Sequence, residues 1–260
     1  MPAQTPHCPP LAVREVEAKS ILTRSRIPGM AYTLNPYIGC SHACAYCYVR
    51  LMQRFFGHAG DRWGSFVDIK RNAAWLALKE VTRKKPGTIM LSSATDCYQP
   101  LEKKVELTRE CLTVLADARA QVSVLTKSAL IVRDLDLLRR LPEPSVGVTI
   151  TTDDDRVRRA FEPGASSISA RLDALRKLKD AGLDPHVFVG PALPMSPERL
   201  AGLLEPLASS VMFDRMNYSN LCGFLLRRHG WEMILDPGWY DQVWDTFRRV
   251  FGKERVESVC

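Results

Sequence analysis

Short apolar stretches alternate with longer segments of helical periodicity along most of the chain. A short apolar run between polar, glycine or proline residues favours a buried strand, and apolar residues three and four positions apart favour an amphipathic helix. On these criteria the sequence predicts strands at 30–34, 88–92, 121–126, 146–151, 186–190 and 211–215. It predicts helices at 102–118, 131–141, 167–181, 197–207 and 237–251.

This alternation predicts an α/β fold, because strands separated by helices of this length form βα units and a parallel sheet. The predicted strands are too few to close a full (βα)8 barrel. We therefore expect a partial (βα)6 barrel at 30–220. The proline-rich residues 1–29 are predicted to form an extended lead-in, and residues 221–260 a C-terminal helical extension packed on the barrel.

The composition is that of an ordinary globular protein, with 260 residues, 46% of them hydrophobic and 25% charged. The sequence contains no apolar run long enough to span a membrane, so no membrane partner is expected. The N-terminus lacks the basic start and apolar stretch of a secretory signal. These features predict a cytoplasmic protein whose thiols stay reduced.

The formal net charge is +7, which suits an anionic partner such as DNA or RNA. Paired arginines recur along the chain, but most of the pairs fall in predicted helices. Each pair on its own is better explained as a solvated helix face. The pairs are Arg139-Arg140, Arg158-Arg159, Arg227-Arg228 and Arg248-Arg249.

Three cysteines follow the first predicted strand, with Cys40, Cys44 and Cys47 in the pattern C-x3-C-x2-C. A structural zinc site needs four ligands, usually in two separated pairs, and a ferredoxin uses four cysteines. Three thiolates on a four-iron cluster leave one iron open to a substrate or cofactor, as in an open catalytic zinc site. The absence of a fourth cysteine therefore makes chemical sense if the site is a catalytic one. The alternative is a non-catalytic iron–sulfur or zinc-binding protein in which His42 completes a closed site.

Polar residues follow several other predicted strands at the same end. In parallel α/β folds, the carboxyl ends of the strands meet at one face, where active sites form. We expect the cysteine loop and these residues to surround one site. Asp153, Asp154 and Asp155 are interpreted as the cap of a helix rather than a metal cluster. The polar segments are 93–96, 126–127, 151–153 and 190–191.

The cysteine pattern, with Tyr46 before the third cysteine, resembles that of the radical S-adenosylmethionine (SAM) superfamily. Further segments resemble its spore photoproduct lyase-like, or DNA repair photolyase-like, branch. The resemblance extends from about residue 20 to about 195. It is carried by the segments 21–50, 66–80, 92–115, 124–138 and 150–183.

The resemblance implies a [4Fe–4S] cluster held by Cys40, Cys44 and Cys47, with SAM bound at the open iron. In this family an electron from the cluster cleaves SAM, and the resulting 5′-deoxyadenosyl radical takes a hydrogen atom from a substrate. A lyase-like repair or modification of nucleic acid is implied, with a small molecule or peptide as the alternative substrate. The electron would come from a reductant such as flavodoxin or ferredoxin.

The resemblance also assigns SAM contacts to individual positions. Tyr46 should lie by the adenine, and Lys127 should pair with the carboxylate of SAM, as an ammonium can do directly. Thr149 falls near the ribose or the methionine end. Structural alternatives are a capping role for Asp96, an ordinary strand position for Thr149 and a solvated Lys127. The other assigned contacts are Thr95, Asp96, Gly190 and Pro191.

Ser93 stands where spore photoproduct lyase itself has a hydrogen-donating cysteine, which argues against efficient spore photoproduct repair. Cys97 is a candidate replacement, because positions 93, 95 and 97 share one face if the segment is extended. The alternative is that Cys97 is a small buried filler. The remaining cysteines, Cys8, Cys111, Cys222 and Cys260, are interpreted as packed or incidental thiols.

Overall fold

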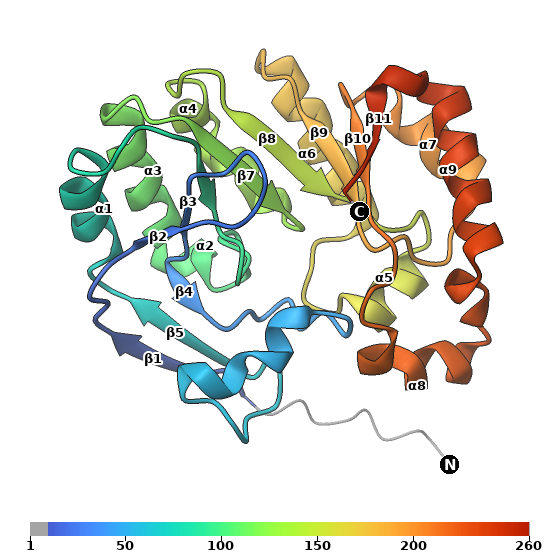
Figure 1. The fold of residues 1–260 in the computed structure, drawn as a ribbon, viewed down its shortest axis with the longest axis horizontal. Coiled ribbons are helices and arrows are strands. Elements are labelled where there is room, and N and C mark those ends of the chain that lie inside the picture. The colour runs from blue at the N-terminus through green and yellow to red at the C-terminus, as the bar shows by residue number, and fades with distance from the viewer. Residues whose placement is uncertain (1–9, 260) are drawn as a thin grey trace.

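The computed structural model describes residues 10–259, and an eight-stranded sheet dominates them. Six strands match the predicted ones and lie side by side in chain order, each parallel to the next. The sheet curves so that helices cover its outer face (Figure 1). The prediction of an α/β partial barrel is therefore confirmed. The matching strands are β3 (Tyr32–Leu34), β6 (Ile89–Leu91), β7 (Val122–Thr126), β8 (Ser145–Thr149), β9 (His186–Val189) and β10 (Val211–Phe213).

Two strands at the edges of this sheet were not predicted. β2 (Leu22–Arg24) pairs antiparallel with β3, and β11 (Val256–Ser258) pairs parallel with β10. Each has only three residues, too few to show a strand periodicity. The predicted boundaries after residues 29 and 220 stay predictions. The segments outside them, 10–29 and 221–259, each contribute a strand to the barrel sheet.

The helices are amphipathic, and their apolar faces pack against the sheet or against one another. The predicted helix at 102–118 is interrupted at Glu106, whose φ of 59° is left-handed. The Glu102 carboxylate accepts a hydrogen bond from the backbone N–H of Thr108 (3.0 Å) and so caps the second piece. The helices are α1 (Ala73–Val81), α2 (Glu102–Val105), α3 (Leu107–Asp117), α4 (Leu135–Leu138), α5 (Asp155–Phe161), α6 (Ile168–Asp180), α7 (Pro197–Leu204), α8 (Ser219–His229) and α9 (Pro237–Phe251).

The predicted helix at 131–141 is also different, because a 3-10 helix (Ala129–Asp134) precedes the short α4. Ser128 begins this segment by accepting a hydrogen bond from the N–H of Leu130. Among the described residues, no helix is long and apolar enough to cross a bilayer.

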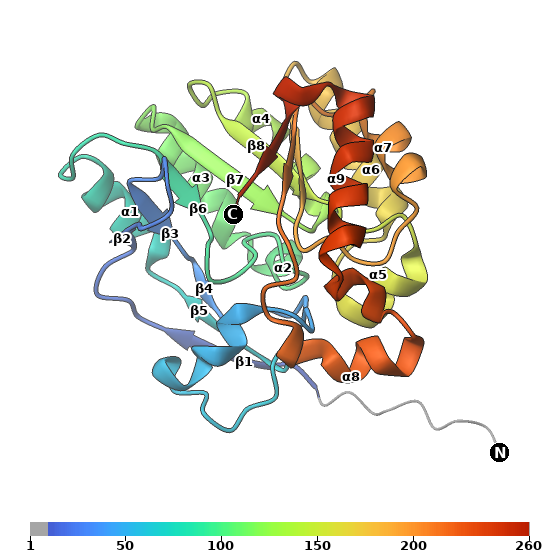
Figure 2. The same cartoon turned by 45° about the vertical axis from the view of Figure 1, so that its right-hand side comes forward.

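A second, three-stranded sheet lies below the large one in Figures 1 and 2. Its order is β1-β5-β4, from β1 (Ala12–Val16), β5 (Phe66–Lys70) and β4 (Tyr37–Ile38). β4 leads directly into the cysteine loop at Gly39, whose φ is 81°. A Cβ atom there would collide with the backbone and ring of Phe66. The small sheet therefore fixes where the loop begins, and only glycine fits the join.

The C-terminal helix α9 is part of the main core. Tyr240, Val243, Phe247 and Phe251 are buried on one face of the helix. The Phe247 ring meets the Phe213 ring of β10 edge-on, with centroids 4.6 Å apart. α9 therefore closes the β10 side of the sheet.

We predict that Phe247→Ala lowers the free energy of unfolding by about 3–5 kcal/mol, because it leaves a cavity between α9 and the sheet. Phe224→Ala is the matched control, since Phe224 on α8 is 67% exposed. That control should change stability by no more than about 0.5 kcal/mol. Chemical denaturation measures both. Equal stability of the two variants would contradict the packing of α9 on β10.

Candidate functional site

The cysteine loop runs from Gly39 to Cys47, at the end of the barrel where the parallel strands finish. Cys40 and Cys44 are buried, and Cys47 is partly exposed. Two tight turns shape the loop, with the N–H of Ala43 donating to the Cys40 carbonyl and that of Cys47 to the Cys44 carbonyl (both 3.2 Å). The three thiols therefore lie on one compact loop, as the sequence predicted.

The segment after β6 holds the first half of this loop. The Thr95 hydroxyl donates to the Gly39 carbonyl (2.6 Å). The side-chain oxygen of Gln99 accepts from the N–H of Ser41 (2.8 Å), and Gln99 is fully buried. Gln99 is a site residue that the sequence analysis missed, because nothing in the local pattern marks it.

The turn between α5 and α6 holds the second half of the loop. The N–H of Ala45 donates to the Phe161 carbonyl (2.8 Å), and the N–H of Gly164 donates to the His42 carbonyl (3.0 Å). A Cβ atom at position 164 would collide with the backbone of Ser41. The close approach of the two backbones therefore requires glycine here.

A buried ion pair lies behind this turn. Glu162 and Arg171 both have 0% exposure and are joined at 2.6 Å. Glu162 also accepts hydrogen bonds from the Tyr46 hydroxyl and from the Thr151 hydroxyl (3.0 Å). Arg171 donates to the Thr149 carbonyl (3.0 Å). These bonds satisfy the two buried charges and link the cysteine loop to α6 and to the end of β8.

The charges around Glu162 keep it ionised. Burial alone would raise the pKa of Glu162, but Arg171, Lys127 and the hydrogen bond from Tyr46 outweigh burial and lower it. The hydroxyl of Tyr46 is held neutral, since burial next to Glu162 raises the pKa of Tyr46 well above its usual value. The hydrogen bond from this hydroxyl to Glu162 therefore fixes the Tyr46 ring on the loop.

Lys127 follows β7, and its ammonium lies 5.8 Å from the centroid of the Tyr46 ring. Within residues 10–259, the lysine Nζ makes no hydrogen bond or ion pair. Burial lowers the pKa of Lys127, but the nearby Cys44, Glu162 and Asp96 raise it by more, so the group stays charged. An unpaired ammonium near Cys44 and Cys47 suits an anionic ligand.

Burial disfavours the thiolate form of the three loop cysteines. Burial raises the pKa of Cys40 to about 12, and burial also raises the pKa of Cys44 and Cys47. Lys127 opposes the shift at Cys44 and Cys47. Iron would have to displace the thiol protons on binding, as is general for cysteine sites. Three thiols on one loop, two of them buried, and a neighbouring ammonium fit an iron–sulfur cluster, whose protein ligands are thiolates.

His42, the fourth ligand of the alternative closed site, contacts a carboxylate in this structure. His42 turns to Asp96 instead, with Nδ1 3.2 Å from Oδ2 of the carboxylate. Among the described residues, no three His, Cys, Asp or Glu side chains converge as the ligands of a single metal ion would.

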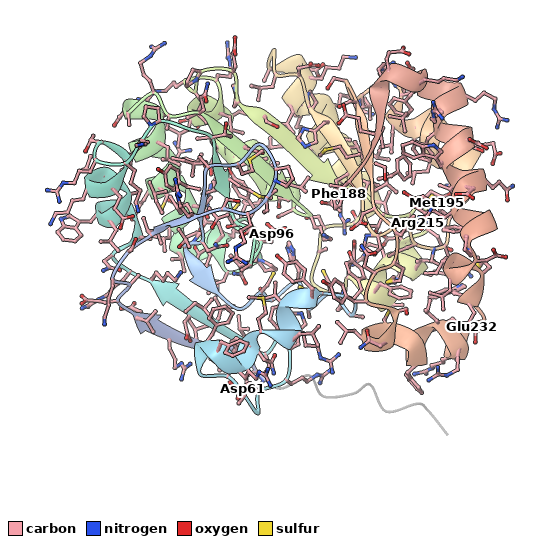
Figure 3. The ribbon with its side chains drawn as sticks, in the orientation of Figure 1. Asp61, Asp96, Phe188, Met195, Arg215 and Glu232 are labelled. Carbon is pink, nitrogen blue, oxygen red and sulfur yellow. The ribbon has the colours of Figure 1, made fainter. Side chains whose placement is uncertain are left out.

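Asp96 accepts hydrogen bonds from other residues of the protein. Its carboxylate accepts from the Thr126 hydroxyl (2.6 Å) and from the backbone N–H of Lys127 (2.8 Å). Burial alone would raise the pKa of Asp96, but His42 and these hydrogen bonds hold it well below the usual range. Figure 3 shows Asp96 in the interior of the curved sheet. The predicted SAM contacts of Asp96 and of Thr95, which binds Gly39, stay predictions.

The remaining predicted SAM contacts lie at the ends of β8 and β9. Thr149 is buried at the last position of β8, and its carbonyl binds Arg171. Gly190 and Pro191 follow β9, and a Cβ atom at position 190 would collide with the ring of Phe188. These residues border the same end of the sheet as the cysteine loop, and their cofactor roles stay predictions.

Cys97 lies in the main hydrophobic core with 0% exposure. Its Sγ is 3.8 Å from the Leu91 carbonyl. The segment bends after β6, so the condition of an extended segment with 93, 95 and 97 on one face is not met. A hydrogen-donating role for Cys97 stays a prediction, and its burial favours the alternative of a packed thiol.

The other cysteines are distant from the loop or pack behind it. Cys111 is buried in the core on α3, and Cys222 is buried on α8 in the cluster that contains Cys44 and Tyr46. Cys8 and Cys260 lie outside the described residues.

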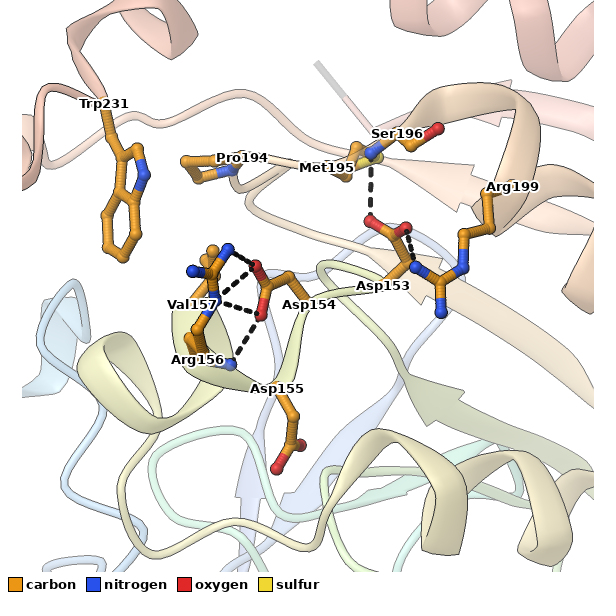
Figure 4. Close-up of a pocket in the computed structure, with 10 residues that line it drawn as sticks. All are labelled: Asp153, Asp154, Asp155, Arg156, Val157, Pro194, Met195, Ser196, Arg199 and Trp231. Atoms are coloured by element: carbon orange, nitrogen blue, oxygen red, sulfur yellow. Dashed lines mark hydrogen bonds and ion pairs between the residues drawn. The ribbon is translucent and has the colours of Figure 1, made fainter.

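An open groove of about 610 Å³ lies beside the N-terminus of α5 (Figure 4). Asp154 caps α5 by accepting from the N–H of Arg156 (2.7 Å), which confirms the capping interpretation. Asp153 accepts from the N–H of Ser196 (2.9 Å). The acidic side chains therefore organise two loops. The groove is lined by Asp153, Asp154, Asp155, Arg156, Val157, Pro194, Met195, Ser196, Arg199 and Trp231.

Comparison with known proteins adds to this geometry. A family model described as the radical SAM superfamily matches residues 34–206. An uncharacterized protein of Methanocaldococcus jannaschii is 35% identical over 211 residues, covering 80% of this chain and 78% of that protein. A radical SAM Nα-GlyT isomerase of Pseudomonas phage M6 is 24% identical over 183 residues, covering 69% of this chain and 37% of that protein.

Among solved structures, the fold is similar to that of a spore photoproduct lyase mutant with bound AdoMet and dinucleoside spore photoproduct. The TM-score is 0.67 at 17% identity, over 96% of this chain and 82% of that chain. At this identity the match establishes a shared fold.

We predict that Glu162→Gln lowers the free energy of unfolding by about 3–5 kcal/mol, because it leaves Arg171 charged, buried and unpaired. Iron retention after reconstitution should fall as well, since the variant loosens Tyr46 on the cysteine loop. The matched control is Asp117→Asn, which removes an exposed ion pair with Arg140 and should cost at most about 1 kcal/mol. Denaturation and iron analysis provide the readouts. A Glu162→Gln variant with unchanged stability and iron content would contradict the positioning role.

Proposed function

This chain belongs to the radical SAM superfamily, and on that premise we propose that it holds a [4Fe–4S] cluster through Cys40, Cys44 and Cys47 and uses SAM to modify nucleic acid. When bound, the cluster and SAM supply a one-electron cleavage that yields a 5′-deoxyadenosyl radical able to abstract hydrogen from a substrate. The observation that carries the proposal is one loop of three thiols, held on two sides, beside an unpaired ammonium.

The chain's own residues would orient and protect these groups. Lys127 would pair with the SAM carboxylate, because its ammonium is charged and lacks a partner among the described residues. Tyr46, fixed by Glu162, would lie against the adenine. Thr149, Gly190 and Pro191 would line the rest of the SAM site. Contacts of Thr95 and Asp96 with SAM would need some of their present hydrogen bonds to be shared.

Nucleic acid is proposed as the substrate class for two reasons. The net charge of +7 favours an anionic partner. The structurally similar lyase was solved with a dinucleoside. Ser93 occupies the position of that enzyme's hydrogen-donating cysteine. We therefore do not expect efficient spore photoproduct repair. A flavodoxin or ferredoxin would supply the electron in a reducing cytoplasm, where the loop thiols stay free.

We predict that the anaerobically reconstituted protein releases 5′-deoxyadenosine from SAM with dithionite. Lys127→Met should keep its iron but bind SAM about 10–100-fold more weakly, because a charge-assisted hydrogen bond is worth about 1.5–3 kcal/mol. The EPR change of the reduced cluster on titration with SAM measures this affinity. Lys79→Met, at an exposed position of α1, is the control and should behave as the unmodified protein.

Two outcomes would contradict these statements separately. An iron-loaded protein that never cleaves SAM with any reductant would overturn the proposed function. Wild-type SAM affinity in Lys127→Met would remove only the carboxylate contact.

We also predict that DNA or RNA binding weakens steeply with salt, with a slope of about −0.9 per contacted phosphate on duplex DNA. Filter binding across a salt series measures this slope. Undetectable binding to duplex and single strands at low salt would favour the alternative substrates, a small molecule or a peptide.

A further inference from the structure

An exposed apolar surface begins directly after the cysteine loop. Residues 48–56 form two 3-10 turns, Tyr48–Leu51 and Gln53–Phe56. Leu51 is 49% exposed, Met52 39% and Phe55 70%. Single exposed apolar side chains are common, but three within five positions form a patch of the kind that marks an interaction site.

Cations surround this patch. Arg50, Arg54 and Arg62 are exposed, and the part of the chain that the structure describes offers none of them an ion pair. The Arg54 guanidinium lies 4.8 Å from the centroid of the Phe55 ring. Asp61 adds one exposed carboxylate beside these three arginines, and its Oδ2 lies 2.5 Å from Nδ1 of His58. The surface therefore combines apolar contact area with unbalanced positive charge.

The same surface reaches the cysteine loop. A hollow of about 270 Å³ is lined by Arg50, Gln53, Asp61, Arg62 and Trp63, together with Ala43 and Ala45, the neighbours of Cys44. Other sides of the loop are covered by the segment that contains Thr95 and by the turn at 161–164.

We propose that this surface, the donor-docking face formed by Arg50, Leu51, Arg54, Phe55 and Arg62, binds an acidic electron-transfer protein of the flavodoxin or ferredoxin class. The inference rests on the proposed function, since it identifies where the required electron arrives. One electron leaves the reduced donor and is accepted at the cysteine loop, so that the donor is oxidised and the cluster reduced, with no bond or proton transferred.

Distance and charge support this occupant. Electron transfer slows steeply with distance, and this face follows Cys47 directly in the chain, with Arg50 and Arg62 lining a hollow that Ala43 and Ala45 of the loop also line. Electron-transfer complexes are small, often below about 1,200 Å² of buried surface, so a compact patch is sufficient. Unpaired arginines would attract an acidic partner and speed the encounter.

A nucleic acid fits this face less well. Bases are held by stacking on aromatic rings. Leu51 and Met52 are not aromatic, and the exposed ring of Tyr48 already stacks on Tyr218, with centroids 6.1 Å apart. The exposed ring of Phe55 already carries the Arg54 guanidinium.

Two double variants test the proposal: Leu51→Ser with Phe55→Ser, and Arg50→Glu with Arg54→Glu. Each is assayed for 5′-deoxyadenosine formation with dithionite, which needs no docking, and with photochemically reduced flavodoxin or ferredoxin. We expect unchanged iron content and dithionite-driven rate. The protein-driven rate should fall about tenfold or more, since steering and contact are lost. The wild-type protein-driven rate should also fall as ionic strength rises to about 0.15 M, where charges are screened beyond ~8 Å.

Matched controls come from α1, where Trp75 and Leu78 are 54% and 55% exposed. Trp75→Ser with Leu78→Ser, and Lys79→Glu with Arg83→Glu, should leave both rates unchanged. Equal protein-driven rates in the donor-face variants and the controls would overturn the proposal. So would a donor-face variant that loses nucleic-acid binding while its protein-driven rate is intact.

Direct binding of the oxidised donor to the iron-loaded protein separates this inference from the proposed function. Wild-type binding that is lost in both donor-face variants supports the docking face even if SAM is never cleaved. A wild-type protein that binds neither flavodoxin nor ferredoxin overturns the docking face even if dithionite drives SAM cleavage.

Discussion

The buried ion pair between Glu162 and Arg171 is the interaction on which the geometry of the site depends. Neither charge is exposed, so each must be satisfied within the protein, and both are. Arg171 binds the end of β8 from α6, and Glu162 fixes Tyr46 on the cysteine loop. A network of this kind is stable only when every member is bonded, and such networks specify a unique arrangement. The pair therefore couples the position of the loop to the barrel itself.

The backbone contacts around the loop act in the same direction. At Gly39 and Gly164, two segments of the chain approach so closely that any side chain would collide. Gln99, in the segment after β6, and the carbonyl of Phe161, at the end of α5, both accept hydrogen bonds from the loop. Thiols held in this way lose little freedom when a ligand binds, so less of the binding energy is spent on ordering them. The charged Lys127 can then attract an anion, because no carboxylate of the described residues is bound to its ammonium.

The outer parts of the chain complete the barrel rather than standing apart from it. β2 caps one edge of the large sheet, and β11 covers the other, so that β3 and β10 are not left as open edges. α9 buries its apolar face against β10. With the edges covered, the carboxyl ends of the strands and the cysteine loop share one end of the barrel, and the arginine-rich turns that follow the loop are exposed.

The sequence alone determined the αβ alternation, the six central strands and the cysteine loop, because each is recorded in local spacing that a single segment carries. It did not reveal the break at Glu106, which depends on how the Glu102 carboxylate is used, or the edge strands, which are too short to show a period. It indicated Asp154 as a cap, a role confined to neighbouring residues. It could not show that Tyr46, Glu162 and Arg171 meet, or that Cys97 turns into the core. Those features join residues far apart in the chain, so only the packing of the whole fold decides which charges become buried together and which thiols face the site.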